Sequence, residues 1–269
     1  MSHSGPMISI ITPSYNQAAY IEQTIESVLN QDCAQVEHIV IDGGSTDGTV
    51  DILKRYPHLI WRSEKDRGQA DALNKGLALA KGGIIGWINS DDYYAFNIFG
   101  SVIRHLEATD SPWIVGRQAD VFDNGTLILF KDSPKVTFDT LVKNPDIVKQ
   151  QATFFKKDAL MSVGGWNAER YMVMDYDLWV RLARVAAPVM VNEDWAYFRN
   201  HGAQKSSHGN VLRQSREIAA VLRSEGVSRS LIAFHQATKY WWWAKGLAKE
   251  QLINMGVVPE RYRTRSVRP

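Results

Sequence analysis

Two adjacent acids, Asp91 and Asp92, follow an apolar run at residues 84–88 after two intervening residues. The two carboxylates repel each other unless a positive group lies between them or in front of them. Mg²⁺ or Mn²⁺ is usually held by one or two carboxylates together with substrate phosphates, so the pair is suited to a metal–diphosphate ligand. The alternative is a solvated turn in which one Asp caps a helix near residue 97.

Another acid, Asp42, ends a second apolar run and is followed by Gly43 and Gly44. A carboxylate in this position can accept a nucleobase N–H or bind ribose hydroxyls, while the glycines let a ligand approach the backbone. The alternative is that Asp42 only caps a turn. Whether these acids meet at one site depends on the strands that carry them.

The first hundred residues alternate strand-like and helix-like patterns. The strand-like segments are 7–12, 36–42, 59–63 and 84–88, and the helix-like segments are 20–31, 45–56 and 69–82. Such units, repeating about every 25 residues, predict an α/β fold with a mainly parallel sheet sandwiched by helices. Ligands bind beyond the carboxyl ends of such strands. We therefore expect the functional residues within segments 12–16, 42–47, 63–66 and 89–92.

The later sequence carries different patterns. Asn124 and Gly125 separate two apolar runs within 113–132, which predicts a small additional β-hairpin. Residues 151–167 resemble a strand, a short helix and a Gly-Gly turn, and 188–201 is strand-like. Helical patterns cover 175–186, about 210–224 and about 228–255.

Composition narrows the function. The chain has 269 residues, a net charge of +2 and a single cysteine, Cys33. The small charge implies no nucleic acid partner, and one cysteine excludes an intramolecular disulfide and a Cys-rich zinc site. No P-loop and no G-x-G-x-x-G pattern is present. Since no signal-like segment and no apolar run of roughly 18 residues occurs, we expect a cytoplasmic protein.

Three consecutive tryptophans occupy residues 241–243, with Lys239, Lys245 and Lys249 nearby. Consecutive helical residues span about 200° of arc, so one helix face cannot bury all three. One interpretation is an interfacial helix that makes the protein peripheral at the inner face of the membrane. The other is a helix packed on the domain, with one Trp at a subunit contact in a homo-oligomer.

Four ordered segments carry a resemblance to a known family. They are ISIITPSYNQAAYIEQTIESVLNQ, EHIVIDGGSTDGTVDIL, GQADALNKGLALAKGGIIGWINSDD and MDYDLWVRLA. The chain resembles the family 2 glycosyltransferases, which have the GT-A fold, over about three quarters of its length. The resemblance implies a catalytic domain at 1–208, with a nucleotide-binding half at about 7–95 and an acceptor half at about 96–208. A helical C-terminal extension would follow at 209–269.

The resemblance implies a nucleotide-sugar donor that is bound by residues at the strand ends. It also implies transfer of the sugar with inversion at the anomeric carbon. The residues implied for nucleotide-sugar binding are Thr12, Pro13, Tyr15, Asp42, Asp47, Asp71, Asn74, Asp91 and Lys205. The residues implied for Mg²⁺ or Mn²⁺ are Asp92, Asp91 and His201. Those expected on the acceptor side are Gln151 and Trp166, with a core position as the alternative for Trp166. A glycan or a lipid-linked saccharide is the expected acceptor.

Two positions depart from the family pattern. Many relatives read Asp-Asp-Gly-Ser where this chain has Gly43 after Asp42, and Asp-x-Asp-Asp where this chain begins with Asn89. Each change removes one acid. With the acid at position 89 absent, a metal contact stays possible but has one carboxylate fewer than in many relatives.

A general base is expected in the segment MVMDYDLW at 172–179. Relatives often carry Glu-Asp before the Tyr, with the Asp as base. Here Met174 replaces the Glu, and Asp175 keeps the position of the base. Asp177 is the rival, because two residues apart on a helix the acids point in different directions and one can pair with Arg181. The alternative is that both acids only suit the helix dipole.

Two other functions stay open at this point. A non-catalytic nucleotide-sugar or carbohydrate-binding protein could carry the same acids. A sugar nucleotidyltransferase has a similar sheet, but it is expected to carry a Gly-rich loop with Arg or Lys after the first strand. The segment TPSYNQAAY at 12–20 lacks that loop.

Overall fold

The computed structural model describes residues 7–33, 35–122, 125–129, 135–201, 210–238 and 240–241. The chain divides into two compact units, Met1–Gln204 and Lys205–Pro269. The first unit contains every strand described here. The second contains α8 (Val211–Ser224) and a further helical stretch at 229–238.

A nine-stranded sheet runs through the first unit in the order β3-β2-β1-β4-β8-β6-β9-β5, with β7 paired to β6. Its first four strands, β1 (Ile8–Ser14), β2 (Val36–Asp42), β3 (Ile60–Ser63) and β4 (Ile84–Trp87), are mutually parallel. The remaining strands are β5 (Tyr93–Tyr94), β6 (Trp113–Phe122), β7 (Leu127–Leu129), β8 (Thr153–Lys156) and β9 (Val189–Asn200). β9 is parallel to β6, while β8 is antiparallel to both β4 and β6.

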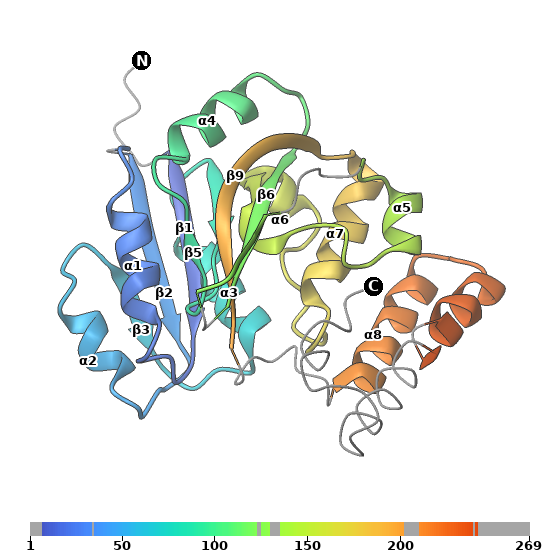
Figure 1. Ribbon diagram of the computed structural model, residues 1–269, viewed down its shortest axis with the longest axis horizontal. Helices are drawn as coiled ribbons and strands as arrows, with labels where there is room; N and C mark the ends of the chain where they lie inside the picture. The colour runs from blue at the N-terminus through green and yellow to red at the C-terminus, as the bar shows by residue number, and fades with distance from the viewer. Residues whose placement is uncertain are drawn as a thin grey trace. The chain divides into compact units, whose positions relative to one another are not determined.

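Helices cover both faces of the parallel strands (Figure 1). Those of the first unit are α1 (Ile21–Leu29), α2 (Thr49–Lys54), α3 (Gln69–Leu79), α4 (Phe99–Glu107), α5 (Phe138–Lys143), η1 (Gln150–Ala152), α6 (Lys157–Ser162) and α7 (Met174–Val185). Ile21 and Ile25 of α1 pack against Val40 on one face of β2. On the other face α3 lies so close that a Cβ added to Gly76 would overlap the side chain of Ile11. Alternate residues of these strands therefore pack against helices on opposite faces of the sheet.

The expected strands and helices are found, with small shifts at their ends. The predicted hairpin exists as the antiparallel pair β6–β7, although Asn124 lies outside the described residues. All three residues of β7 are exposed. The helix expected over 69–82 ends at Leu79 because Ala80 is already extended. Of the helix expected over 228–255, the part after Trp241 lies outside the described residues.

The core of the first unit is rich in large aromatic side chains. Trp87, Trp113, Trp166, Trp179 and Trp195 are each at most 2% exposed. The rings of Trp113 and Trp179 stack at 5.6 Å, which ties β6 to α7. Within the part of the chain that is described, no helix combines the length and the apolar character needed to cross a membrane.

Candidate active site

The parallel strands bring their carboxyl ends to one edge of the sheet. Ser14 pairs with Asp42, and Asp42 pairs with Ser63, so β1, β2 and β3 end level with one another. β4 is parallel to β1, with Trp87 opposite Ile11. The segment after β4 therefore leaves the sheet at the same edge. This edge carries the acids that the sequence singles out in the first hundred residues.

Asp42 is fully buried and its carboxylate is occupied by its own loop. Its Oδ2 accepts hydrogen bonds from the backbone N–H of Gly44 at 3.1 Å, the N–H of Ser45 at 2.9 Å and the hydroxyl of Ser63 at 2.6 Å. Its Oδ1 accepts the hydroxyl of Ser45. A carboxylate has about four acceptor positions, so these donors use them. In this arrangement Asp42 holds the turn after β2 and joins it to β3.

A second carboxylate, that of Asp66, approaches the same turn. A Cβ added to Gly43 would lie 3.0 Å from Oδ2 of Asp66, so the absence of a side chain at 43 makes room for it. Oδ1 of Asp66 accepts the N–H of Gly68 at 2.8 Å. Asp66 lies in the expected strand-end segment 63–66, but its type and spacing gave no role to it. The close approach of Gly43 is visible only in three dimensions.

The residues at the end of β1 differ in accessibility. Thr12 and Pro13 are buried, and Oγ1 of Thr12 lies 2.9 Å from Nε2 of His38. Burial, followed by the nearby charge of His58, lowers the pKa of His38 to about 3. Tyr15, by contrast, is 62% exposed. Of these three residues at the end of β1, Tyr15 alone presents a large accessible side chain.

Asp47 lies in the loop before α2 and is exposed. Its Oδ2 accepts the N–H of Ala18 at 2.9 Å, and its Oδ1 accepts the N–H and the hydroxyl of Thr49 at 3.1 and 2.6 Å. Asp47 thus joins the loop after β1 to the start of α2. It supports the sheet edge through the two loops.

Asp71 and Asn74 lie on α3 and have separate partners. The carboxylate of Asp71 contacts Arg67 at 2.9 Å and Lys75 at 3.5 Å. The amide of Asn74 donates to the carbonyl of Trp166 at 2.6 Å and accepts its N–H at 3.0 Å. Asn74 therefore clamps the Gly-Gly-Trp turn at 164–166 onto α3.

The two acids after β4 have different surroundings. The carboxylate of Asp91 is 20% exposed, and its Oδ2 lies 3.1 Å from Nε2 of His201, a side chain that is 3% exposed. Asp92 is fully buried. Its Oδ2 accepts the amide of Gln151 at 2.8 Å, and its Oδ1 accepts the N–H of Arg199 at 3.0 Å. Burial, followed by the charge of Asp91, raises the pKa of Asp92 well above its ordinary value.

Asn89 connects this acid pair to its surroundings by four hydrogen bonds. Its Oδ1 accepts from Gln69 at 2.7 Å and from the indole of Trp87 at 2.9 Å. Its Nδ2 donates to Gln150 at 2.9 Å and to Asp92 at 3.3 Å. A carboxylate at position 89 could not donate to these two acceptors. The amide of Asn89 therefore matches its neighbours, and both its oxygen and its nitrogen are hydrogen-bonded to other side chains.

Asp91 and His201 are two of the three expected metal ligands, and their side chains meet. Among the described residues, no group of three or more His, Cys, Asp or Glu side chains is arranged to hold a metal. Mg²⁺ is, however, usually bound by one or two carboxylates together with substrate phosphates. Asp91 supplies one such carboxylate, and its Oδ2 lies 3.1 Å from Nε2 of His201. Asp92, buried behind them, is placed to support the pair.

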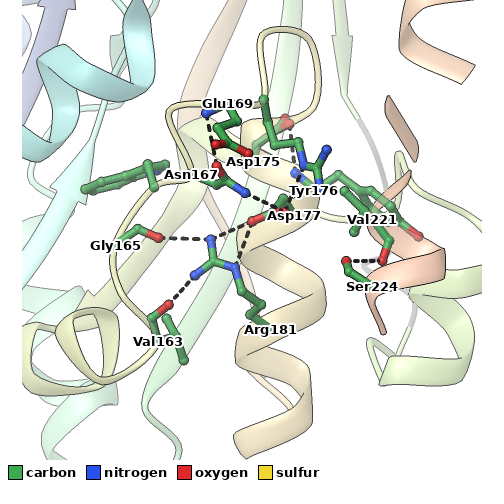
Figure 2. A network of polar contacts seen from close by, with 12 residues as sticks. Val163, Gly165, Asn167, Glu169, Asp175, Tyr176, Asp177, Arg181, Val221 and Ser224 are labelled. Atoms are coloured by element: carbon green, nitrogen blue, oxygen red, sulfur yellow. Dashed lines mark hydrogen bonds and ion pairs between the residues drawn. The ribbon is translucent and has the colours of Figure 1, made fainter. Parts of the chain in front are cut away.

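The start of α7 holds the remaining acid pair (Figure 2). Asp177 is 5% exposed, and its Oδ2 contacts the guanidinium of Arg181 at 2.7 Å while its Oδ1 lies 3.4 Å from Nε of Arg170. Figure 2 shows Asp177 beside Arg181. Oδ1 of Asp175 accepts the N–H of Tyr176 at 2.8 Å. Asp175 is half-buried. The rival for the base position is thus engaged in an ion pair within the fold.

Arg181 also holds the turn that precedes α7. It donates to the carbonyls of Val163 and Gly165, the latter at 2.9 Å. Asn74 holds the next residue of this turn from the other side. α3, the turn and α7 are therefore connected by side chains that bind backbone atoms.

The two residues expected on the acceptor side are buried. Gln151 is 5% exposed and donates to Asp92. Trp166 is 1% exposed and packs edge-on against Trp87 at 5.6 Å. Its burial contradicts a stacking role and agrees with the alternative of a core position, because a buried ring offers no face to a sugar. Lys205 lies outside the described residues.

Comparison with known proteins identifies relatives of this site and fold. Residues 9–165 match the family Glycosyl transferase family 2. A relative from Bacillus subtilis (strain 168), "Putative teichuronic acid biosynthesis glycosyltransferase TuaG", is 43% identical over 152 residues. That segment is 54% of this chain and 60% of the relative's length.

Solved structures show the same fold. S. aureus TarS 1–349 in complex with UDP superposes with a TM-score of 0.64 at 18% identity, covering 87% of this chain and 70% of that one. The mannosyltransferase PcManGT from Pyrobaculum calidifontis, in complex with GDP-Man and Mn²⁺, superposes with a TM-score of 0.59 at 18% identity. It covers 91% of this chain and 72% of that one. The expected GT-A fold is confirmed.

Proposed function

Because the chain belongs to glycosyl transferase family 2, we propose that it transfers a sugar from a nucleoside-diphosphate sugar to a glycan or lipid-linked saccharide, with inversion. The observation that carries this proposal is the meeting of Asp91 and His201 at 3.1 Å, above the buried Asp92. Asp91 follows β4 at the sheet edge where the ends of β1, β2 and β3 also lie, and His201 follows β9. A diphosphate placed there would face a carboxylate and an imidazole.

The donor is proposed to lie along this edge. The nucleoside half would rest near Tyr15, whose side chain is exposed, and near the turn at 42–45, which the carboxylate of Asp66 approaches at Gly43. TarS binds UDP and PcManGT binds GDP-Man with Mn²⁺. These neighbours support a nucleoside diphosphate and a divalent cation as ligands of the same fold.

Asp91 and His201 would hold the cation, and Asp92 would support them from the interior. When bound, the cation supplies Lewis-acid stabilisation of the charge that develops on the leaving diphosphate. An acceptor hydroxyl forms the new bond to the anomeric carbon while the bond to the diphosphate oxygen breaks. Asp175 takes the hydroxyl proton, a general-base role typically worth roughly 10²–10⁴-fold in rate.

The choice of Asp175 over Asp177 rests on their partners. Asp177 is buried between Arg181 and Arg170, and these two ion pairs hold its carboxylate within the fold. Asp175 lies in the first turn of the same helix but is half-buried, and its Oδ1 accepts the N–H of Tyr176 at 2.8 Å. Asp175 is therefore the acid that an acceptor could approach.

The test is a panel of nucleotide sugars incubated with Mn²⁺ or Mg²⁺, with release of free nucleoside diphosphate as the measurement. We expect metal-dependent release with at least one donor, and its loss in Asp91→Asn. Asp158→Asn is the matched control, because Asp158 is an exposed acid in the first turn of another helix, α6. Tight binding of UDP and Mn²⁺ by calorimetry without turnover of any donor or acceptor would favour the non-catalytic binding protein instead.

The domain division and the membrane contact remain proposals of the same kind. We propose residues 209–269 as a helical extension that reaches the inner membrane surface through its aromatic and basic residues. Trp241 and Phe234 are 57% and 67% exposed, which favours such a contact. Residues 242–269 lie outside the described part of the chain. Equal co-sedimentation of wild type and a Trp241→Glu, Phe234→Glu variant with anionic liposomes would contradict the contact.

A further inference from the structure

Arg199 lies near the end of β9 and binds the segment after β4 at two separate points. Its backbone N–H donates to Oδ1 of Asp92 at 3.0 Å, and its side-chain Nε donates to the carbonyl oxygen of Asp91 at 2.9 Å. Its Nη2 donates to Oε1 of Gln23 on α1 at 2.5 Å. One residue thus joins β9, the acid pair and α1.

Aromatic rings fix the position of this guanidinium. The Cζ atom of Arg199 lies 5.0 Å from the ring centre of Tyr20 and 5.4 Å from that of Tyr93. Tyr20 also packs on the ring of His201, with the ring centres 4.5 Å apart. The side chains of Arg199 and His201 therefore share one aromatic neighbour, at the start of α1.

His201 follows Arg199 by two residues, and Asp91 precedes Asp92 by one. When Arg199 holds both the carboxylate of Asp92 and the carbonyl of Asp91, the end of β9 is aligned with the exit of β4. This alignment places Nε2 of His201 at 3.1 Å from Oδ2 of Asp91. The two side chains come from positions 110 residues apart, so their meeting depends on a tertiary connection of this kind.

We propose that Arg199 is the positioning residue for the Asp91–His201 pair, and that it acts through the backbone of Asp91 rather than by touching the donor. The inference rests on the proposed function of that pair as a divalent-cation site. Two side-chain donor groups of Arg199, Nε and Nη2, already bind protein acceptors on Asp91 and Gln23. Partners that orient metal ligands typically change metal affinity by roughly 10–100-fold when they are removed.

The chemistry of arginine is suited to this role. Its planar guanidinium keeps a charge and offers donors in a fixed fork, so it can bind a carbonyl and an amide oxygen at once while lying on an aromatic face. Lysine offers a single point charge on a flexible stem. A Lys at 199 would keep the charge near Asp91 and Asp92 but lose the simultaneous contacts.

The experiment titrates Mn²⁺ into the full-length protein in the presence of saturating UDP, with free Mn²⁺ followed by electron paramagnetic resonance. We expect Arg199→Gln to raise the Mn²⁺ dissociation constant by roughly 10-fold or more, and Arg199→Lys to raise it by a smaller factor. Arg117→Gln is the matched control. It removes an arginine that binds the same strand at Asp194, with Nε 2.8 Å from Oδ1.

The outcomes separate the inference from the function on which it rests. If Asp91→Asn leaves Mn²⁺ binding unchanged, the proposed cation site itself is wrong. If Asp91→Asn weakens binding but Arg199→Gln does not, only the positioning role is wrong. The positioning role is also overturned if Arg117→Gln weakens Mn²⁺ binding as much as Arg199→Gln does. It is overturned as well if Arg199→Gln lowers the affinity for UDP by the same factor with EDTA as with Mn²⁺.

Discussion

The exit of β4 and the start of α7 each carry a pair of acids in which one member is buried. After β4, the buried Asp92 accepts hydrogen bonds from Gln151, Asn89 and the backbone of Arg199. At α7, the buried Asp177 contacts the guanidinium groups of Arg181 and Arg170. The partner acid, Asp91 or Asp175, is more accessible in each pair.

The difference lies in what compensates the buried charge. Amide and backbone donors stabilise a carboxylate without cancelling its charge, and burial keeps the pKa of Asp92 raised. An arginine partner neutralises the charge and turns the pair into a connection within the fold. A buried acid supported by neutral donors suits a place where a cation is to bind. A buried acid beside arginines suits a structural joint.

The largest expected effect separates the two acids of α7. Asp175→Asn should lower kcat by roughly 10²–10⁴-fold and leave nucleotide affinity unchanged, because it removes the proposed base and no donor contact. Asp177→Asn should mainly weaken the fold. Initial rates with the best donor and calorimetry with UDP and Mn²⁺ measure both. A folded Asp177→Asn enzyme with the greater loss of kcat would reverse the assignment.

A second prediction concerns the arginine of this joint. Arg181→Met leaves Asp177 buried without its closest cation, and should lower the free energy of unfolding by roughly 3–5 kcal/mol. Urea unfolding followed by tryptophan fluorescence measures it. The double change Asp177→Leu with Arg181→Met removes both charges and should recover much of the loss. No recovery would mean that Arg181 acts mainly through the carbonyls of Val163 and Gly165.

A third prediction tests the neutral support of the other pair. Asn89→Asp restores the acid that many relatives carry, but here it faces Gln150 and Asp92 with an oxygen instead of an N–H. Two acceptors without donors should cost roughly 3 kcal/mol of stability. Asn192→Asp, an exposed change on β9 beside Arg117, is the control and should stay near wild type. An Asn89→Asp protein as stable as wild type would contradict the role of the amide.

The smallest predicted effect is a pH dependence of stability that comes from the buried His38 and not from the acid pairs. The pKa of His38 is lowered to about 3 by burial, so the unfolded chain binds a proton that the folded chain does not. The free energy of unfolding is therefore not reduced by His38 at neutral pH, and it decreases as the pH drops below about 6.5, because the unfolded chain then gains a proton. Between pH 7 and 5 the loss should be about 2 kcal/mol.

Unfolding curves of wild type and His38→Gln at several pH values check this expectation. The His38→Gln variant should depend less on pH. His58→Gln should reduce the pH dependence by a smaller amount, because the charge of His58 is the lesser cause of the lowered pKa of His38. Equal pH dependence in all three proteins would assign acid sensitivity to another group.

Much of the fold followed from sequence because parallel strands obey local patterns. The apolar runs before Asp42 and Asp91 predicted strands, and parallel strands place their carboxyl ends at one edge. The division of roles within each acid pair did not follow. Asp92 accepts a hydrogen bond from the N–H of Arg199, a residue 107 positions away, and no local sequence pattern predicts such a contact. Asp66 lacked a signal for the same reason.

Trp166 shows a different limit. A tryptophan after two glycines fits both a sugar platform and a core position, since the side chain has a large apolar body and one polar atom. Only the packing of Trp87 and the clamp from Asn74 decide between them. The residue type allowed both positions for Trp166, and the tertiary contacts place its ring in the core.

The short strand β7 has a practical consequence for work with this protein. Leu127, Ile128 and Leu129 are 50%, 44% and 56% exposed, and within the described sheet β7 pairs with β6 alone. A strand of this kind offers its second side as a template for another chain. Concentrated samples should therefore be prone to self-association and turbidity, and a lysine at Ile128 is the simplest way to keep crystallisation stocks monodisperse.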